Sequence, residues 1–273
     1  MFEDLVFFQE TISAAVLAGL SCSIIGVFIF CLRIPFVGVL IAHAAMAGAI
    51  LAQFLGWPEL PPALGMSFLS IFFVGWLTDH TEVDLNISLS ILFSLMMGLA
   101  FLGIGLIPEP KTPILSLLWG NILLVTRTEV LAMIIVTLCL LSMIGLGFRQ
   151  LKAVLFSRTI AAALGLREEI YFYALLLLSG GVVSVNLNTI GGLMLYSLLV
   201  NPAAGAYQLT YSLKAMVIIA AFLGVGASLL GFLCSYLWSL PTGASIVICS
   251  SIEFALCAVF SPKRRKFIKG NNQ

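Results

Sequence analysis

The chain has 273 residues, of which 61% are hydrophobic and only 9% are charged. Soluble domains carry about 25% charged residues, so this composition excludes an ordinary soluble domain and predicts a polytopic membrane protein. The net charge of +1 gives no indication of a nucleic-acid partner. The sequence contains no G-x-x-x-x-G-K-[ST] phosphate loop, so any ATP that drives this protein is expected to be hydrolysed by another chain.

Apolar segments long enough to cross a membrane recur along the chain and predict an all-helical transmembrane bundle of about nine spans. The expected spans cover residues 11–32, 36–56, 63–77, 85–107, 129–148, 170–187, 189–206, 211–238 and 243–260. The third and seventh are short, so seven full spans with two re-entrant segments are an alternative. A short interfacial helix is expected over residues 118–123. Residues 1–262 are interpreted as one transmembrane domain, followed by a basic tail over 263–273.

The distribution of Lys and Arg sets the expected orientation. Nine spans place the two termini on opposite sides of the membrane. With the C-terminus in the cytoplasm and the N-terminus outside, 11 of the 13 basic residues lie inside, and only Lys111 and Arg127 lie outside. All six cysteines fall in or at the edge of apolar segments, so no disulfide framework is expected.

One of the two histidines, His43, lies in the middle of the apolar segment that begins near Arg33 and Pro35. Polar side chains inside a membrane are costly and usually line a pathway or pair with a partner. Imidazole is also a good ligand for zinc, manganese or iron. His43 is therefore a candidate metal-pathway residue, and the alternative is a hydrogen bond to a carbonyl group on the next helix. Small residues around it, including Gly38 and Gly48, allow close helix approach.

A short polar helix is predicted within the long connection between residues 149 and 169. Ser157 suits the N-cap position, and Gly165 suits the position just after the helix.

The seventh expected span contains a proline, Pro202, next to Asn201. Proline in a helix interior removes a hydrogen bond and clashes with the preceding turn. Broken helices at membrane depth are tolerated where they are buried in protein or line a cavity. Asn201 and Pro202, with Asn186 and Asn188 just upstream, are therefore candidates for lining a cavity at a broken helix. An ordinary proline kink packed by neighbouring helices is the alternative.

The last expected span carries Cys249, Glu253 and Cys257 at four-residue intervals, which places them on one helical face. Thiolates and a carboxylate could ligate a borderline-soft cation. The alternatives are that the cysteines pack as small apolar residues and that Glu253 makes a structural hydrogen bond.

The chain resembles the permease subunits of metal-type ABC importers over roughly Leu17 to Phe260. Four stretches carry the resemblance: Arg33–Gly48, similar to R-x-x-F-x-G-D-x-x-x-H-A-x-x-x-G; Phe156–Leu166, similar to F-D-x-x-x-A-x-x-x-G-L; Ile190–Ala204, similar to V-G-x-L-L-V-x-A-L-L-x-x-P-A-A; and Leu240–Val247, similar to D-x-P-[ST]-G-x-x-I-V. The family's Asp is replaced by Val39 in the first stretch, by Ser157 in the second and by Ser239 in the fourth. Either other ligands handle the metal, or this chain is the less active half of a heterodimer.

The resemblance implies a multi-pass protein of the prokaryotic inner membrane that imports a divalent manganese, zinc or iron ion by alternating access and is not an enzyme. It implies no permanently bound cofactor. The implied partners are a cytoplasmic ABC ATPase that hydrolyses ATP, a second permease copy or paralogue, an extracytoplasmic metal-binding protein and the lipid membrane. Residues 157–165 resemble the cytoplasmic coupling helix that docks on the ATPase, with Ser157, Arg158, Ala161 and Gly165 as the candidate coupling residues.

The polar stretch over residues 78–84 is dense in possible ligands, with Asp79, His80, Glu82 and Asp84. It is a candidate exit site for metal, and the alternative is a solvated loop that meets the ATPase. Asp84 also stands where an N-cap is wanted before Leu85. Two rival functions remain open. One is a related permease for a metal chelate such as a siderophore or cobalamin, and the other is an ion-coupled secondary transporter with Glu253 as its proton site.

Overall fold

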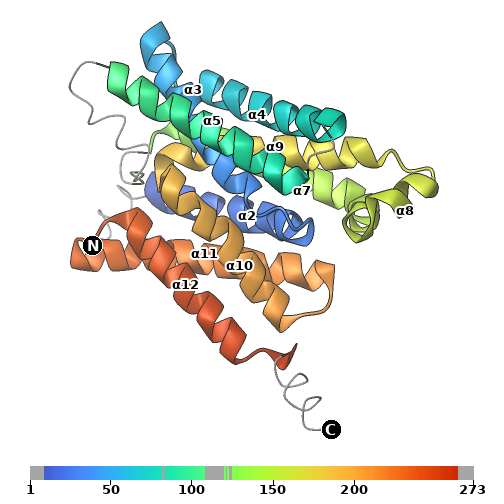
Figure 1. The fold of residues 1–273 in the computed structure, drawn as a ribbon. Coiled ribbons are helices and arrows are strands. Elements are labelled where there is room, and N and C mark those ends of the chain that lie inside the picture. Colours follow the sequence, from blue (N-terminus) through green and yellow to red (C-terminus); the bar gives the residue numbers. More distant parts are fainter. Residues whose placement is uncertain (1–8, 82–83, 108–119, 121, 123–124, 264–273) are drawn as a thin grey trace.

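The computed structural model describes residues 9–81, 84–107, 120, 122 and 125–263, and within these ranges the long regular elements are all helices (Figure 1). The expected all-helical bundle is confirmed. The helices are α2 (Gln9–Cys31), α3 (Val37–Leu55), α4 (Leu60–Thr81), α5 (Leu85–Leu106), α7 (Arg127–Phe156), α8 (Arg158–Ala163), α9 (Glu168–Ile190), α10 (Gly192–Leu209), α11 (Leu213–Trp238) and α12 (Thr242–Val259).

Eight helices of the described chain are long and apolar enough to cross a membrane. They correspond to eight of the nine expected spans. The remaining one, the seventh, corresponds to α10, which is not among these eight helices. This 18-residue helix contains Asn201 and Pro202 and packs against α2, α3, α11 and α12. Because neighbouring helices pack around it, the polar Asn201 and the proline can be accommodated within the bundle.

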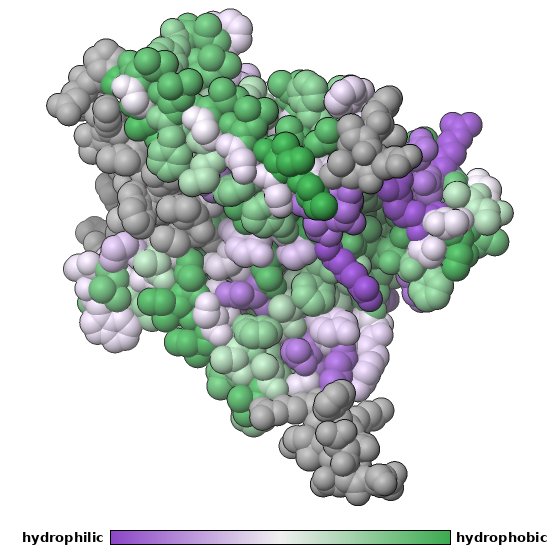
Figure 2. All heavy atoms as spheres, viewed as in Figure 1, coloured by the Kyte–Doolittle hydropathy of each residue, from purple (hydrophilic) through white to green (hydrophobic). Residues whose placement is uncertain are grey.

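Helices α2, α3 and α9 form the centre of the bundle. In their most apolar windows 72%, 78% and 67% of the residues are buried, whereas α4, α5, α7, α11 and α12 reach at most 33%. The outer helices therefore turn large apolar surfaces outward, as a lipid-facing protein does. Figure 2 shows hydrophobic side chains over most of the visible face, and hydrophilic ones gathered toward the end where α8 lies.

Small residues bring the helices close together where the sequence predicts it. A Cβ atom built on Gly48 of α3 would lie 2.2 Å from the carbonyl oxygen of Pro62 in α4. The same construction on Gly19 of α2 would place Cβ 2.4 Å from the carbonyl oxygen of Gly224 in α11. Backbone meets backbone at both crossings, so only glycine fits there.

Two expected boundaries are corrected by the structure. The third span is not short, because α4 begins at Leu60, carries Pro61 and Pro62 in its first turn and continues to Thr81. Proline is tolerated there, because the first-turn N–H groups have no partner within the helix anyway. The fifth span does not end at Phe148 but continues to Phe156 past non-helical dihedral angles at Gly147.

A third correction concerns the break near Pro202. Helix α10 runs without interruption through Pro202, so the prediction of a helix broken at this proline is wrong. The interruption instead falls at Gly191, between α9 and α10, where φ is +90° and ψ is 142°. Glycine adopts this conformation without a steric penalty, so the chain changes direction there while neighbouring helices hold the proline inside α10.

Two predictions fall largely outside the described residues, and a third is not tested. The expected interfacial helix over 118–123 is described only at Gly120 and Ile122, and the basic tail only at Lys263. The orientation of the termini relative to the membrane remains a prediction from the distribution of charge.

Candidate functional site

His43 lies in the middle of α3 and is buried, with 7% of its surface exposed. Its ring meets that of Phe93 from α5 edge to face, with 5.0 Å between the centroids. Its Nδ1 atom is 2.9 Å from the carbonyl oxygen of Val39, one turn earlier in the same helix. The alternative of a hydrogen bond to a carbonyl on the next helix is therefore wrong, since the bond stays within α3.

The bond to Val39 sets the tautomer of the imidazole. A carbonyl oxygen only accepts, so Nδ1 must carry the hydrogen and donate it. In the neutral ring Nε2 then carries the lone pair, and no hydrogen bond to Nε2 is found among the described residues. A neutral imidazole whose other nitrogen donates to a carbonyl has the arrangement that metal-binding histidines use. His43 can therefore offer Nε2 to a passing cation.

The second candidate group lies on α12, at the other side of α10. Glu253 is half-buried and faces Gly226 of α11, where a Cβ would lie 3.1 Å from its Oε1 atom. Its Oε2 atom is buried without a hydrogen-bond partner. Cys257 is buried against Gly205 of α10, where a Cβ would lie 3.3 Å from its Sγ atom. Cys249, one turn before Glu253, contacts Cys234 of α11.

The structure does not bring His43 together with this second group. Helix α3 packs against α4, α5, α9 and α10, whereas α12 packs against α10 and α11. In the described part of the chain no three His, Cys, Asp or Glu residues form a group that could hold a metal ion. The described residues of one subunit therefore do not assemble a complete ligand shell from such side chains.

Asn186 belongs to a polar contact between central helices. It lies in α9, 1% exposed, and its Nδ2 atom is 2.7 Å from the carbonyl oxygen of Val182 and 3.4 Å from Oγ of Ser21 in α2. Its Oδ1 atom is buried without a partner. Nearby in the sequence, Ser184 forms a 2.8 Å hydrogen bond with Ser67 of α4. Serines in apolar helices are common, so no pattern in the sequence singled out Ser21 or Ser67.

Asn201 ties α10 to the last helix. Its Nδ2 atom is 3.1 Å from the hydroxyl oxygens of both Ser250 and Ser251 in α12. Pro202 is buried beside it. Asn188 lies in the last turn of α9, and its side chain is outside the described set. Asn201 therefore serves as a link between helices in this structure.

Helix α8 has the local structure that the sequence predicts for residues 157–165. Ser157 is the N-cap, and its Oγ accepts a 3.3 Å hydrogen bond from the backbone N–H of Ile160. Gly165 follows the C-cap residue with φ +78°. Arg158 forms a 3.3 Å ion pair with Glu168 and stacks 4.2 Å from the ring centre of Phe172, both in α9.

Ala161 is the buried residue of α8. One small side chain therefore anchors the helix, while Ile160 and Leu164 remain 50% and 72% exposed. A short helix that exposes apolar side chains outside the spans is suited to contact another protein.

The candidate ligands over 78–84 are only partly described. Asp79 and His80 belong to the last turn of α4 rather than to a loop, because the helix continues to Thr81, and their side chains are outside the described set. Glu82 is also outside it. Asp84 is the N-cap of α5, and its Oδ1 atom accepts a 2.8 Å hydrogen bond from the N–H of Asn86, as predicted.

Eight long apolar helices, with a short exposed helix between two of them, define a multi-pass membrane protein. The buried histidine in its central helices is a polar group of the kind that lines a transport pathway. The family model described as the ABC 3 transport family matches residues 4–261. The chain belongs to this family, and it is accordingly a transport protein of the inner membrane rather than an enzyme.

Individual relatives match over nearly the whole chain. The manganese transport system membrane protein of Halalkalibacterium halodurans is 30% identical over 94% of this chain and 88% of its own length. A manganese import system permease protein of Streptococcus gordonii is 28% identical over 96% of this chain and 94% of its own. The solved structure of PsaBC from Streptococcus pneumoniae in complex with Fab superposes with a TM-score of 0.86 at 26% identity, covering 97% of this chain and 98% of that one.

Proposed function

We propose that this chain is the membrane permease subunit of an ATP-driven importer of divalent manganese. The observation that carries the proposal is the similarity, over at least 94% of this chain, to proteins named as manganese transport or import permeases. The family match over residues 4–261 includes all the described helices, among them α3 with His43 and the short α8. Manganese is therefore preferred here to zinc and iron.

The proposed partners follow from the parts of the fold. Helix α8 docks on a separate cytoplasmic ATPase, because it lies between two spans and presents Ile160 and Leu164 to the outside. An external metal-binding protein delivers the ion on the opposite side. A second copy or a paralogue of this chain completes the pathway, which agrees with the absence of a three-residue ligand group within the described part of one subunit. ATP binding and hydrolysis then switch the dimer between outward-open and inward-open states.

His43 is proposed to bind the ion transiently through Nε2. A borderline-hard ion such as Mn²⁺ accepts imidazole together with oxygen ligands. The site has the imidazole of His43 but not the Asp of the family motif, because Val39 stands at that position. A site with this single side-chain ligand binds the ion weakly and leaves most of its coordination positions open. Weak binding suits a permease, because an ion that is held by a closed ligand shell cannot leave.

The experiment is a measurement of the manganese, zinc, iron and nickel content of cells with and without this gene. A selective loss of manganese, restored by the wild-type gene, is the expected result. A selective loss of zinc or iron would reassign the ion. If only the uptake of a metal chelate changes, the chelate permease is the better description. Uptake that persists without the ATPase and collapses with an uncoupler would instead favour an ion-coupled transporter with Glu253 as the proton site.

A further inference from the structure

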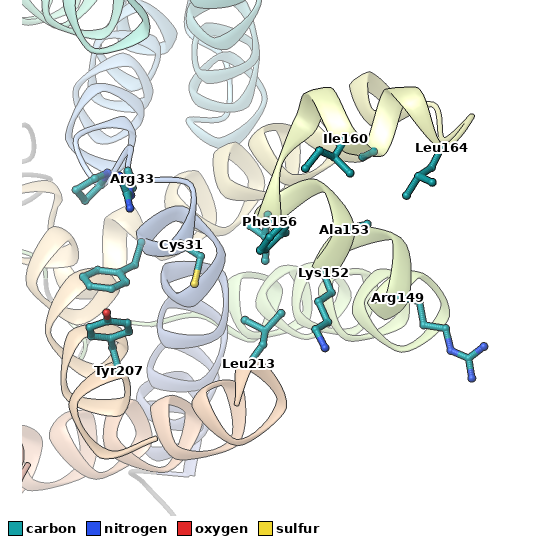
Figure 3. Close-up of a pocket in the computed structure, with 14 residues that line it drawn as sticks. Cys31, Arg33, Arg149, Lys152, Ala153, Phe156, Ile160, Leu164, Tyr207 and Leu213 are labelled. Carbon is teal, nitrogen blue, oxygen red and sulfur yellow. The ribbon is translucent and has the colours of Figure 1, made fainter. Parts of the chain in front are cut away.

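A cavity of about 910 Å³ lies where the ends of α2, α7, α8, α10 and α11 meet (Figure 3). Its walls are mainly apolar and include Phe30 from α2, Leu155 from α7 and Leu213 at the start of α11. The volume is within the range of sites that enclose small molecules. The cavity is distinct from the histidine of α3, because His43 does not line it.

Three cations line this mostly apolar cavity, and no carboxylate is among its described lining residues. Arg33 comes from the turn between α2 and α3, and Figure 3 places it across the cavity from Lys152 and Arg149 of α7. The ion pairs Glu10–Arg127 and Arg158–Glu168 involve none of the three. The site therefore carries positive charge that no described carboxylate of the chain neutralises.

The length of α7 places this charge at the level of lipid headgroups. Its 30 residues extend for about 45 Å at 1.5 Å per residue, whereas the hydrocarbon core of a bilayer is about 30 Å thick. The last part of α7, beyond the irregular Gly147, therefore extends past the hydrocarbon. Arg149 and Lys152 lie in that part, and the apolar walls formed by Phe30 and Leu155 adjoin it.

We propose that this cavity binds the phosphate headgroup of an anionic phospholipid. Arg149 and Lys152 contact the phosphate by charge-assisted hydrogen bonds, Arg33 adds positive charge from the opposite side of the cavity, and the apolar walls contact the first part of the acyl chains. A basic pocket between spanning helices on the side with most of the positive charge is the arrangement that recognises anionic headgroups. The proposal does not depend on which ion the protein carries.

The test is native mass spectrometry of the full-length chain, purified in detergent and titrated with phosphatidylglycerol or with phosphatidylcholine. Wild type is expected to retain phosphatidylglycerol and to show little retention of phosphatidylcholine. Lys152→Gln and Arg149→Gln are each expected to weaken retention about fivefold, the effect of removing one cation near an anionic surface (roughly 1 kcal/mol). Lys152→Arg keeps the charge and is expected to retain the lipid.

Arg167→Gln is the matched control, because Arg167 is also exposed and on the side with most of the positive charge but does not line the cavity. It is expected to behave as wild type. Equal retention in Lys152→Gln, Arg149→Gln and wild type would overturn the proposal, as would an equal loss in Arg167→Gln. Complete displacement of the lipid by an equal concentration of inorganic phosphate would assign the site to a free anion. Loss of ATPase association with unchanged lipid retention in the Lys152 and Arg149 variants would assign the cations to protein docking.

Discussion

The N-cap of α8 offers a sharp test of whether this short helix couples the permease to an ATPase. The change is Ser157→Ala, which removes the oxygen that accepts the 3.3 Å hydrogen bond from the N–H of Ile160. The backbone of Ser157 is already extended, with φ −164° and ψ 120°, so alanine introduces no strain. Only the cap is lost.

The magnitude follows from the small size of the helix. Replacing a serine N-cap by alanine costs about 1 kcal/mol. Helix α8 has six residues, well below the length at which an isolated helix is stable. Its remaining supports include the burial of Ala161, the stacking of Arg158 on Phe172 and the partly exposed ion pair of Arg158 with Glu168, and a solvent-exposed ion pair contributes little. We therefore expect the association with the ATPase to weaken about fivefold, the equivalent of that 1 kcal/mol.

The assay is ATP-driven ion uptake in proteoliposomes, together with the affinity of the reconstituted permease for its ATPase. Ser157→Asp is the matched control, because aspartate caps a helix as well as serine does and is also the residue of the family pattern at this position. It is expected to retain wild-type coupling. Wild-type affinity in Ser157→Ala would refute the reasoning. So would an equal defect in Ser157→Asp, since the cap would then not be the property that matters.

Three further predictions follow from the described contacts. His43→Ala is expected to reduce ion uptake by at least roughly tenfold, the smallest loss typical of changes around a metal, and unchanged uptake of radiolabelled ion would exclude His43 from the pathway. Gly224→Val is expected to destabilise the bundle by about 1–3 kcal/mol, because a Cβ would lie 2.4 Å from a carbonyl oxygen of α2, whereas Gly98→Ala enters open space and should leave thermal unfolding unchanged. Glu10→Gln should cost less than about 1 kcal/mol, since Arg127 in this 2.6 Å pair is 91% exposed, and a larger fall in the unfolding temperature would contradict that view of the pair.

The features that the sequence predicted correctly depend on short stretches of chain. The spans follow from runs of apolar residues, because each helix satisfies its own backbone hydrogen bonds and needs only enough apolar length to cross a membrane. The N-caps at Ser157 and Asp84 and the turn at Gly165 were also predicted, since a cap involves residues two or three positions apart. Family motifs identified the class of transporter for the same reason, because each motif is a local pattern.

The errors occurred where neighbouring helices decide the outcome. A helix broken at Pro202 and an ordinary proline packed by neighbouring helices were both open from the sequence, and α10 runs continuously through Pro202 while the interruption lies at Gly191. For His43, a hydrogen bond to the next helix was the alternative to a metal-pathway role, and that alternative fails because Nδ1 bonds to the carbonyl of Val39 in the same helix. Proline and histidine each have several acceptable environments, so the residue type alone does not select among them.

The sequence by itself thus determined the class of fold, most of the helices and the residues able to bind a cation or cap a helix. Only the tertiary structure decided which of these residues meet. It separated His43 from Cys249, Glu253 and Cys257 by packing α3 and α12 on different neighbours, and it joined Asn186 to Ser21 across 165 positions of the chain. The physical reason is that helix packing depends on the shapes of whole helical faces, and the neighbours of a face come from distant parts of the chain.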